Sequence, residues 1–154
     1  MAKSSNRVNE SSNIDRLVVR HLRIGWCGLL VFLALGIILE AFHGLKLDLY
    51  LDVRNQTRRF MWTLCHTHGT LFSIVHIVFA TSLSQLSRLS STQFTIASLG
   101  LTSGWLLMPA GFFLGGLWFY GGDPGLGIFL VPLGGLCLLI GVGSIAMATI
   151  RTNK

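Results

Sequence analysis

Charged residues are scarce in this chain. Only 12% of its 154 residues are Asp, Glu, Lys or Arg, whereas charged residues make up about a quarter of a typical soluble domain. Hydrophobic residues make up 51% of the chain, and they occur in long blocks rather than in an alternating or helical pattern. The low charge content therefore excludes an ordinary soluble domain and indicates a polytopic membrane protein that forms one compact unit.

Three further absences narrow the class of protein. The only three cysteines, Cys27, Cys65 and Cys137, all lie within apolar blocks, so we do not expect a disulfide framework. The first 20 residues are polar, and we expect no cleavable signal peptide. Basic residues flank the apolar blocks and form no compact patch, so the net charge of +6 does not indicate nucleic-acid binding. The expected partner is the lipid bilayer.

Four apolar blocks are each long enough for a transmembrane helix, which needs about 20 residues. They predict spans at about 22–43, 59–83, 94–120 and 126–150. Residues 1–20 are predicted to be a polar cytoplasmic tail, either disordered or with a short interfacial helix near residues 13–20. Residues 21–154 then form a single domain, and the predicted fold class is an all-α, four-helix transmembrane bundle.

The basic residues predict the orientation of these spans. With both termini in the cytoplasm, four basic residues lie outside: Lys46, Arg54, Arg58 and Arg59. The other eight lie inside: Lys3, Arg7, Arg16, Arg20, Arg23, Arg88, Arg151 and Lys154. Because basic residues concentrate in cytoplasmic loops, we expect both termini in the cytoplasm, in a bacterial inner membrane.

The segments between and within the spans carry turn and packing signals. Residues 45–53 alternate between apolar and polar, and we expect an extended or helical segment at the membrane interface. Residues 121–125 predict a turn, and Pro109 predicts a kink in the third span. Glycines four residues apart permit close helix contact, and two such pairs are predicted to serve helix packing: Gly100 with Gly104, and Gly111 with Gly115. Gly25, Gly28 and Gly36 lie on or near one face of the first span.

Ionisable residues cluster around the first loop. Glu40 and His43 end the first span and lie three residues apart, on one helix face. His66 and His68 lie in the second span, about 10 and 14 Å along the helix from Arg59 at ~1.5 Å per residue. Ionisable residues at membrane depth are costly and usually face a bundle interior, a cavity or a ligand. The sequence therefore predicts a polar site near the outer leaflet.

Helical geometry separates the histidines of the second span. His66 and His68 differ by about 200° around the helix, so they cannot face one ligand without distortion. One helix face carries His66, Gly69, Ser73 and His76, and the other carries His68, Phe72 and Val75. Gly69 leaves room for either a flat group such as haem or a closely packed helix.

Three interpretations of this cluster remain open. Glu40, His43 and His66 (or His68 in its place) offer ligands for a transition metal. The imidazoles of His43, His66 and His68 alternatively offer axial ligands for a b-type haem. In the third interpretation Glu40 pairs with a histidine or with Arg58 or Arg59, and the histidines hydrogen-bond across helices. Arg58 and Arg59 are expected to anchor the helix end or to bind an anionic group.

Residues 65–74, Cys-His-Thr-His-Gly-Thr-Leu-Phe-Ser-Ile, resemble the His-Gly helix that carries a haem ligand in subunit I of haem–copper oxidases. They also resemble the start of a helix in NnrS-type and uncharacterised small bacterial membrane proteins. The oxidase resemblance implies that His68 is a haem ligand. The chain has too few spans for a catalytic oxidase, so the resemblance covers only a haem-bearing fragment.

The sequence thus predicts a small membrane protein that binds haem b or a transition metal and acts as a redox-related or accessory subunit. One alternative is a non-catalytic structural or assembly subunit without cofactor, associated with other membrane subunits or with copies of itself. Another is a small oligomeric channel or transporter in which Pro109 and Pro132 break helices. No catalytic residue is identified, and we do not expect the isolated chain to be an enzyme.

Overall fold

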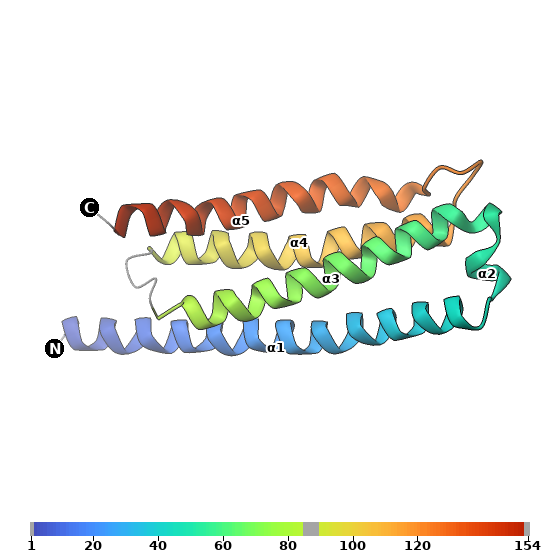
Figure 1. The fold of residues 1–154 in the computed structure, drawn as a ribbon. Helices are drawn as coiled ribbons and strands as arrows, with labels where there is room; N and C mark the ends of the chain where they lie inside the picture. Colours follow the sequence, from blue (N-terminus) through green and yellow to red (C-terminus); the bar gives the residue numbers. More distant parts are fainter. Residues whose placement is uncertain (1, 85–89, 153–154) are drawn as a thin grey trace.

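The computed structural model describes the backbone of residues 2–84 and 90–152 and the side chains of residues 14–84 and 90–150. Five α-helices follow one another along the chain: α1 (Ala2–Gly44), α2 (Asp48–Leu51), α3 (Gln56–Ser82), α4 (Ser91–Leu117) and α5 (Leu130–Thr152) (Figure 1). Two short 3-10 helices, η1 (Val53–Asn55) and η2 (Leu126–Phe129), precede α3 and α5. The described residues contain no β-strand, so the predicted all-α fold is confirmed.

Four segments are long and apolar enough to cross a membrane: Ile14–Gly44, Val53–Ser82, Ser91–Leu117 and Leu126–Ile150. They overlap the four predicted spans, so the described residues contain four candidate membrane helices, as predicted. Both ends of the chain lie at one end of the bundle, and α2 lies at the other (Figure 1). We call these the terminal end and the α2 end.

The first helix is longer than predicted. It begins at Ala2 and includes residues 2–20 of the segment that is predicted to be a tail. No glycine or proline occurs between residues 2 and 24 to interrupt it. Ile14, Leu17 and Val18 also pack against the core cluster around Phe79 and Leu83, which favours helix before the predicted span. The side chains of Lys3, Arg7, Arg88, Arg151 and Lys154 lie outside the described part.

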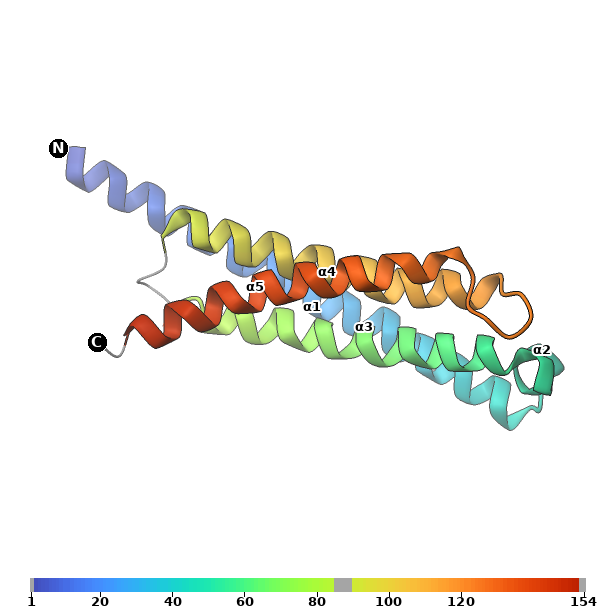
Figure 2. The same ribbon diagram turned by 90° about the horizontal axis from the view of Figure 1, so that it is seen from above.

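The long helices pack in the order α1–α3–α4–α5 (Figures 1 and 2). The inner helices α3 and α4 thus each have two long neighbours, whereas α1 and α5 have one main neighbour each. Buried apolar side chains form three clusters along this arrangement. Phe79, Leu83 and Leu101 lie in the cluster of the terminal end, and Leu39, Tyr50 and Trp62 lie in that of the α2 end. Met61, Cys65 and Phe112 form the third.

Glycines allow α4 and α5 to approach closely. A Cβ added to Gly100 would lie 2.6 Å from the carbonyl oxygen of Cys137, and one added to Gly141 would lie 2.9 Å from the amide nitrogen of Leu101. Both neighbours are backbone atoms, which cannot move aside without shifting a helix. Gly104 and Gly111 also lie against α5 or η2, whereas a Cβ on Gly115 would make only ordinary contacts of 3.6 Å or more.

The connections follow their local sequences. Residues 45–53 form a bend and the short helix α2, which agrees with the helical form expected there. Their place at a membrane interface stays a prediction. Gly121 and Gly122 both have positive φ, 59° and 97°, and Tyr120 and Asp123 exchange two backbone hydrogen bonds around them. The predicted turn is therefore a tight hairpin of the kind that requires positive φ at both central residues.

Neither proline ends a long helix. Pro109 lies inside α4, which is one helix from Ser91 to Leu117. Pro132 lies in the first turn of α5, where the missing N–H would have no intrahelical partner in any case. The predicted helix breaks at these two positions are absent from the structure.

Candidate functional site

Glu40 and His43 lie on the outside of the bundle. Both side chains are exposed, whereas the intervening Phe42 and the nearby Leu39 point into the cluster of the α2 end. Within the described part of the chain, neither Glu40 nor His43 has a side-chain hydrogen bond or an ion pair. The predicted pairing of Glu40 with Arg58 or Arg59 is therefore not formed in this chain.

His66 lies between α1 and α3. Its Nδ1 is 2.7 Å from the carbonyl oxygen of Phe32, and its imidazole occupies the space beside Gly36. The Phe32 ring in turn occupies the space beside Gly69. Of the two groups expected beside Gly69, a closely packed helix is the one present, because α1 fills the site with its own phenylalanine.

His68 faces α4 instead. Its ring lies 4.9 Å from the ring of Phe112 and 5.6 Å from that of Phe72, measured between centroids. Its Nδ1 is 2.9 Å from the carbonyl oxygen of Leu64. The two histidines thus lie on different faces of α3, in agreement with their helical spacing.

The hydrogen bonds of both histidines leave one ring nitrogen with a lone pair. A carbonyl oxygen can only accept, so Nδ1 carries the hydrogen and Nε2 is unprotonated in each neutral ring. Metal-bound histidines usually have this arrangement. The remaining ligands are not in place, however. No group of three or more His, Cys, Asp or Glu residues suited to a metal ion occurs among the described residues. A metal site on Glu40, His43 and His66 stays a prediction.

Arg58 connects three segments at the α2 end. Its guanidinium donates hydrogen bonds to the carbonyl oxygens of Gly116 and Leu49, both at 3.2 Å. The same group lies 5.1 Å from the ring centroid of Phe119 and 5.6 Å from that of Trp62. These contacts make Arg58 an anchor of α3 within the bundle, whereas the anchoring role expected of Arg58 and Arg59 in the membrane stays a prediction. Arg59 is half-buried and makes no such contact in the described part.

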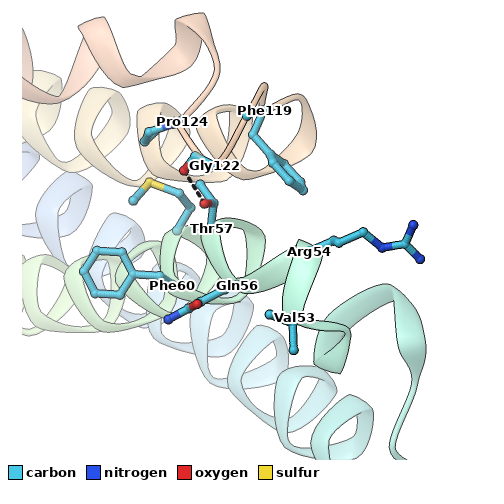
Figure 3. A pocket seen from close by; sticks show the side chains of 10 residues that line it. Val53, Arg54, Gln56, Thr57, Phe60, Phe119, Gly122 and Pro124 are labelled. Atoms are coloured by element: carbon cyan, nitrogen blue, oxygen red, sulfur yellow. Dashed lines mark hydrogen bonds between the residues drawn. The ribbon is translucent and has the colours of Figure 1, made fainter.

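A hollow of about 810 Å³ lies beside this anchor (Figure 3). It lies between the start of α3 and the hairpin after α4, and Thr57 crosses it to donate a hydrogen bond to the carbonyl oxygen of Gly122. Arg54 extends away from the hollow (Figure 3) and pairs with Asp52 at 3.0 Å. Hydrogen bonds from Arg54 lower the pKa of the Asp52 carboxyl. The hollow therefore contains no unpaired buried charge that would identify a ligand.

The most completely buried polar group of the described chain lies nearer the terminal end. His21 of α1 and His76 of α3 are 0% and 1% exposed, and their Nδ1 atoms are 2.6 Å apart. Nε2 of His21 lies 2.9 Å from the hydroxyl of Ser98 on α4. The ring of Trp105, also on α4, lies 6.0 Å from His76, and its indole donates to Ser73 at 2.9 Å. Three helices are thus joined by one polar cluster.

The short Nδ1–Nδ1 distance limits the protonation of this pair. One Nδ1 must carry the hydrogen and the other the lone pair, since two hydrogens cannot occupy the same contact. If His76 donates, His21 donates from Nε2 to Ser98. If His21 donates, Ser98 donates to His21 and a hydrogen remains on Nε2 of His76. Nε2 of His76 is buried and has no hydrogen-bond partner among the described residues. The backbone of Leu101 lies near the His76 ring. The tautomer of one ring therefore fixes the tautomer of the other.

His21 was not among the predicted site residues, because it precedes the predicted start of the first span. The sequence contains a signal that would have found it. His21, Gly25, Gly28 and Phe32 follow one another at intervals of four, three and four residues, which places them on one helix face. All of them face α3, as His66 and His76 face α1. Extending the glycine face of the first span by one turn would have assigned His21 to the interface.

Comparisons with protein-family models, curated proteins and solved structures found no match to this chain.

Proposed function

We propose that this chain is a non-catalytic accessory subunit of a larger membrane complex, with both termini on the cytoplasmic side of a bacterial inner membrane. The observation that carries the proposal is the outward position of Glu40 and His43 on α1. Glu40 lies about 6 Å before the end of α1 at ~1.5 Å per residue, near the outer edge of the span. Ionisable groups at this depth usually meet a partner, and the described part of this chain supplies none.

The surface around these residues supports contact with another helix. Cys27, Ala34 and Ala41 are exposed on α1 and follow one another at seven-residue intervals, which keeps them on one face. Small residues on a lipid-facing surface allow a second helix to approach closely. Ile37, which is 72% exposed, lies on the same face, one turn from Glu40. The partner helix would supply a basic residue or hydrogen-bond donors at the depth of Glu40.

A role with haem or a transition metal would depend on the same partner. Glu40 and His43 offer one carboxylate and one imidazole, whereas a structural zinc site has four ligands. His66 and His68 have suitable tautomers, but they face α1 and α4 and not this surface. The accessory role therefore has more support than a cofactor site contained within this chain.

Site-specific photocrosslinking in native membranes tests the proposal. A photoreactive phenylalanine analogue in place of Ile37 is expected to give one discrete adduct with a second membrane chain. The same analogue in place of Leu139, which is 71% exposed on α5, is expected to crosslink to lipid alone. The double variant Glu40→Gln/His43→Gln should lose most of the Ile37 adduct, whereas Asp48→Asn in α2 should retain it. Equal crosslinking from both positions, or no adduct from Ile37, would contradict the proposal.

A further inference from the structure

A second hollow, of about 380 Å³, opens between α1 and α4 near the terminal end. Arg16 and Arg20, one helical turn apart on α1, line one side. Ser91 and Thr95, one turn apart on α4, line the other. The hollow thus combines two permanent positive charges with two hydroxyl groups. A phosphate group accepts hydrogen bonds from guanidinium groups and hydroxyls, so this combination suits it. Of the two hydroxyls, that of Thr95 already donates to the carbonyl oxygen of Ser91 at 3.0 Å, which leaves Ser91 as the hydroxyl donor.

Its depth in the membrane adds a second requirement on the ligand. The apolar part of the first span begins near Leu22, so Arg20 and Arg16 lie about 3 and 9 Å before it at ~1.5 Å per residue. The two headgroup layers of a bilayer add about 10–15 Å to a hydrocarbon core of about 30 Å, so each is about 5–7 Å thick. Arg20 then lies within the headgroup layer and Arg16 lies just beyond its outer edge. Ile14, Leu17 and Phe94 give the same hollow an apolar side. A ligand that fits has both an anionic head and an apolar body.

The local charges favour an anion. Among the described residues, no acidic side chain lines this hollow. Asp15 borders a neighbouring hollow on α1, which Arg16 and Arg20 also line together with Arg23, so arginines outnumber acidic groups there too. Ser91 is the first residue of α4, where the helix dipole is positive. A basic pocket between transmembrane helices on the cytoplasmic side is a recurrent form of anionic lipid site.

We propose that this hollow binds the headgroup of an anionic phospholipid of the cytoplasmic leaflet. Arg16 and Arg20 would hold its phosphate, the Ser91 hydroxyl would donate a hydrogen bond to it, and Phe94 would contact the start of an acyl chain. The Thr95 hydroxyl donates to the carbonyl oxygen of Ser91 at 3.0 Å and would only line the site. The site is distinct from the α1 surface proposed above for a partner chain, because it lies at the opposite end of the span and faces α4.

Native mass spectrometry of the purified chain in detergent tests this proposal with phosphatidylglycerol and phosphatidylcholine as probes. The wild-type chain is expected to retain phosphatidylglycerol in preference to phosphatidylcholine. Arg16→Gln/Arg20→Gln should weaken that retention by about tenfold or more, since each arginine near the surface is worth about fivefold. Arg23→Gln removes the same charge one turn further along α1, outside the hollow, and is expected to change retention by less than about threefold.

Two controls distinguish a lipid site from general attraction between anions and a basic surface. Arg20→Lys keeps the charge and should retain most of the lipid binding. If the double variant Arg16→Gln/Arg20→Gln does not fold, the single variant Arg20→Gln replaces it in the same measurement. Inorganic phosphate at millimolar concentration should not displace the lipid, because it lacks the apolar body. Equal retention of the two lipids, or equal loss in Arg23→Gln, would overturn the proposal, as would displacement by phosphate alone.

Discussion

Five imidazoles occur in this chain, and their neighbours give them different roles. His43 is exposed, His66 and His68 are half-buried with one carbonyl partner each, and His21 and His76 are buried against each other. Hydrogen bonding to a backbone carbonyl fixes a tautomer, whereas hydrogen bonding to another imidazole makes the two tautomers depend on each other. The chemistry of each histidine is therefore decided by what it contacts, not by its depth alone.

The His21–His76 pair should show strong coupling in a double-mutant cycle. His21→Leu or His76→Leu alone leaves a buried imidazole nitrogen without a partner, and each is expected to lower the free energy of unfolding by about 1–3 kcal/mol. The double variant removes both polar rings and should cost less than the sum of the two single variants. Titration with a denaturing detergent, followed by circular dichroism, measures these differences. His43→Leu is the control, with an expected change below about 0.5 kcal/mol; additive effects at His21 and His76 would contradict the coupling.

Residue-level prediction from the sequence succeeded where helical periodicity was sufficient. It separated His66 from His68 and placed Gly69 against a close neighbour. It could not decide which way Glu40 and His43 point, because both faces of the first span are apolar and its periodicity is weak. The identity of the group beside Gly69, the ring of Phe32, depends on the register between α1 and α3, which no local pattern encodes.

At the level of the helices, glycines allow the backbones of neighbouring helices to pack closely against each other. Where α4 meets α5, Gly100 and Gly141 bring the two backbones close enough to exclude any side chain. On the opposite side of α5, Gly135 and Gly143 have no atom within 4 Å of an added Cβ. Glycines of one helix thus differ in whether they lie at an interface, and nothing in the local sequence distinguishes the two kinds.

This difference predicts opposite outcomes for two matched substitutions. Gly100→Leu places a side chain against the Cys137 carbonyl and is expected to destabilise the bundle by about 1–3 kcal/mol or more. Gly135→Leu makes the same chemical change toward open space and should be neutral or slightly stabilising, because leucine favours helix over glycine. Thermal unfolding in detergent gives both values. A similar loss in the two variants would show that α5 has a further neighbour at Gly135.

The extents of the helices were predictable only in part. Hydropathy located all four spans. It placed the start of the first span near Leu22, whereas α1 begins about 20 residues earlier, at Ala2. Hydropathy reports where the apolar block begins, whereas a helix continues until a residue or a contact stops it. Pro109 illustrates the reverse case, since a residue that often interrupts a helix lies inside α4 without ending it. The kink expected at Pro109 stays a prediction.

As a whole, the molecule has an asymmetric pair of ends. The α2 end contains two compact connections and the contacts of Arg58, whereas the terminal end contains the His21–His76 cluster and the arginines of α1. Of these features, the sequence predicted only the larger number of basic residues on the side of the termini. From the positive-inside rule, we expect the terminal end to face the cytoplasm.

Labelling of single cysteines tests that orientation. In a background without Cys27, Cys65 and Cys137, Lys46→Cys at the α2 end is expected to react with a membrane-impermeant maleimide in intact spheroplasts. Thr92→Cys at the terminal end, which is also exposed, should react only after permeabilisation. The reverse pattern would place the termini outside and would also move the proposed lipid site to the other leaflet.

The order in which the helices pack, α1–α3–α4–α5, has a consequence for how the protein is made. Each main interface joins long helices that are consecutive in the chain. Because synthesis proceeds from the N-terminus, α1 and α3 can pair before α4 has left the ribosome, and α5 can then pair with an α4 already in place. No main interface has to wait for a partner that lies farther along the chain than the next long helix. The bundle can therefore assemble during synthesis by the addition of one long helix at a time, each packing against the long helix made before it.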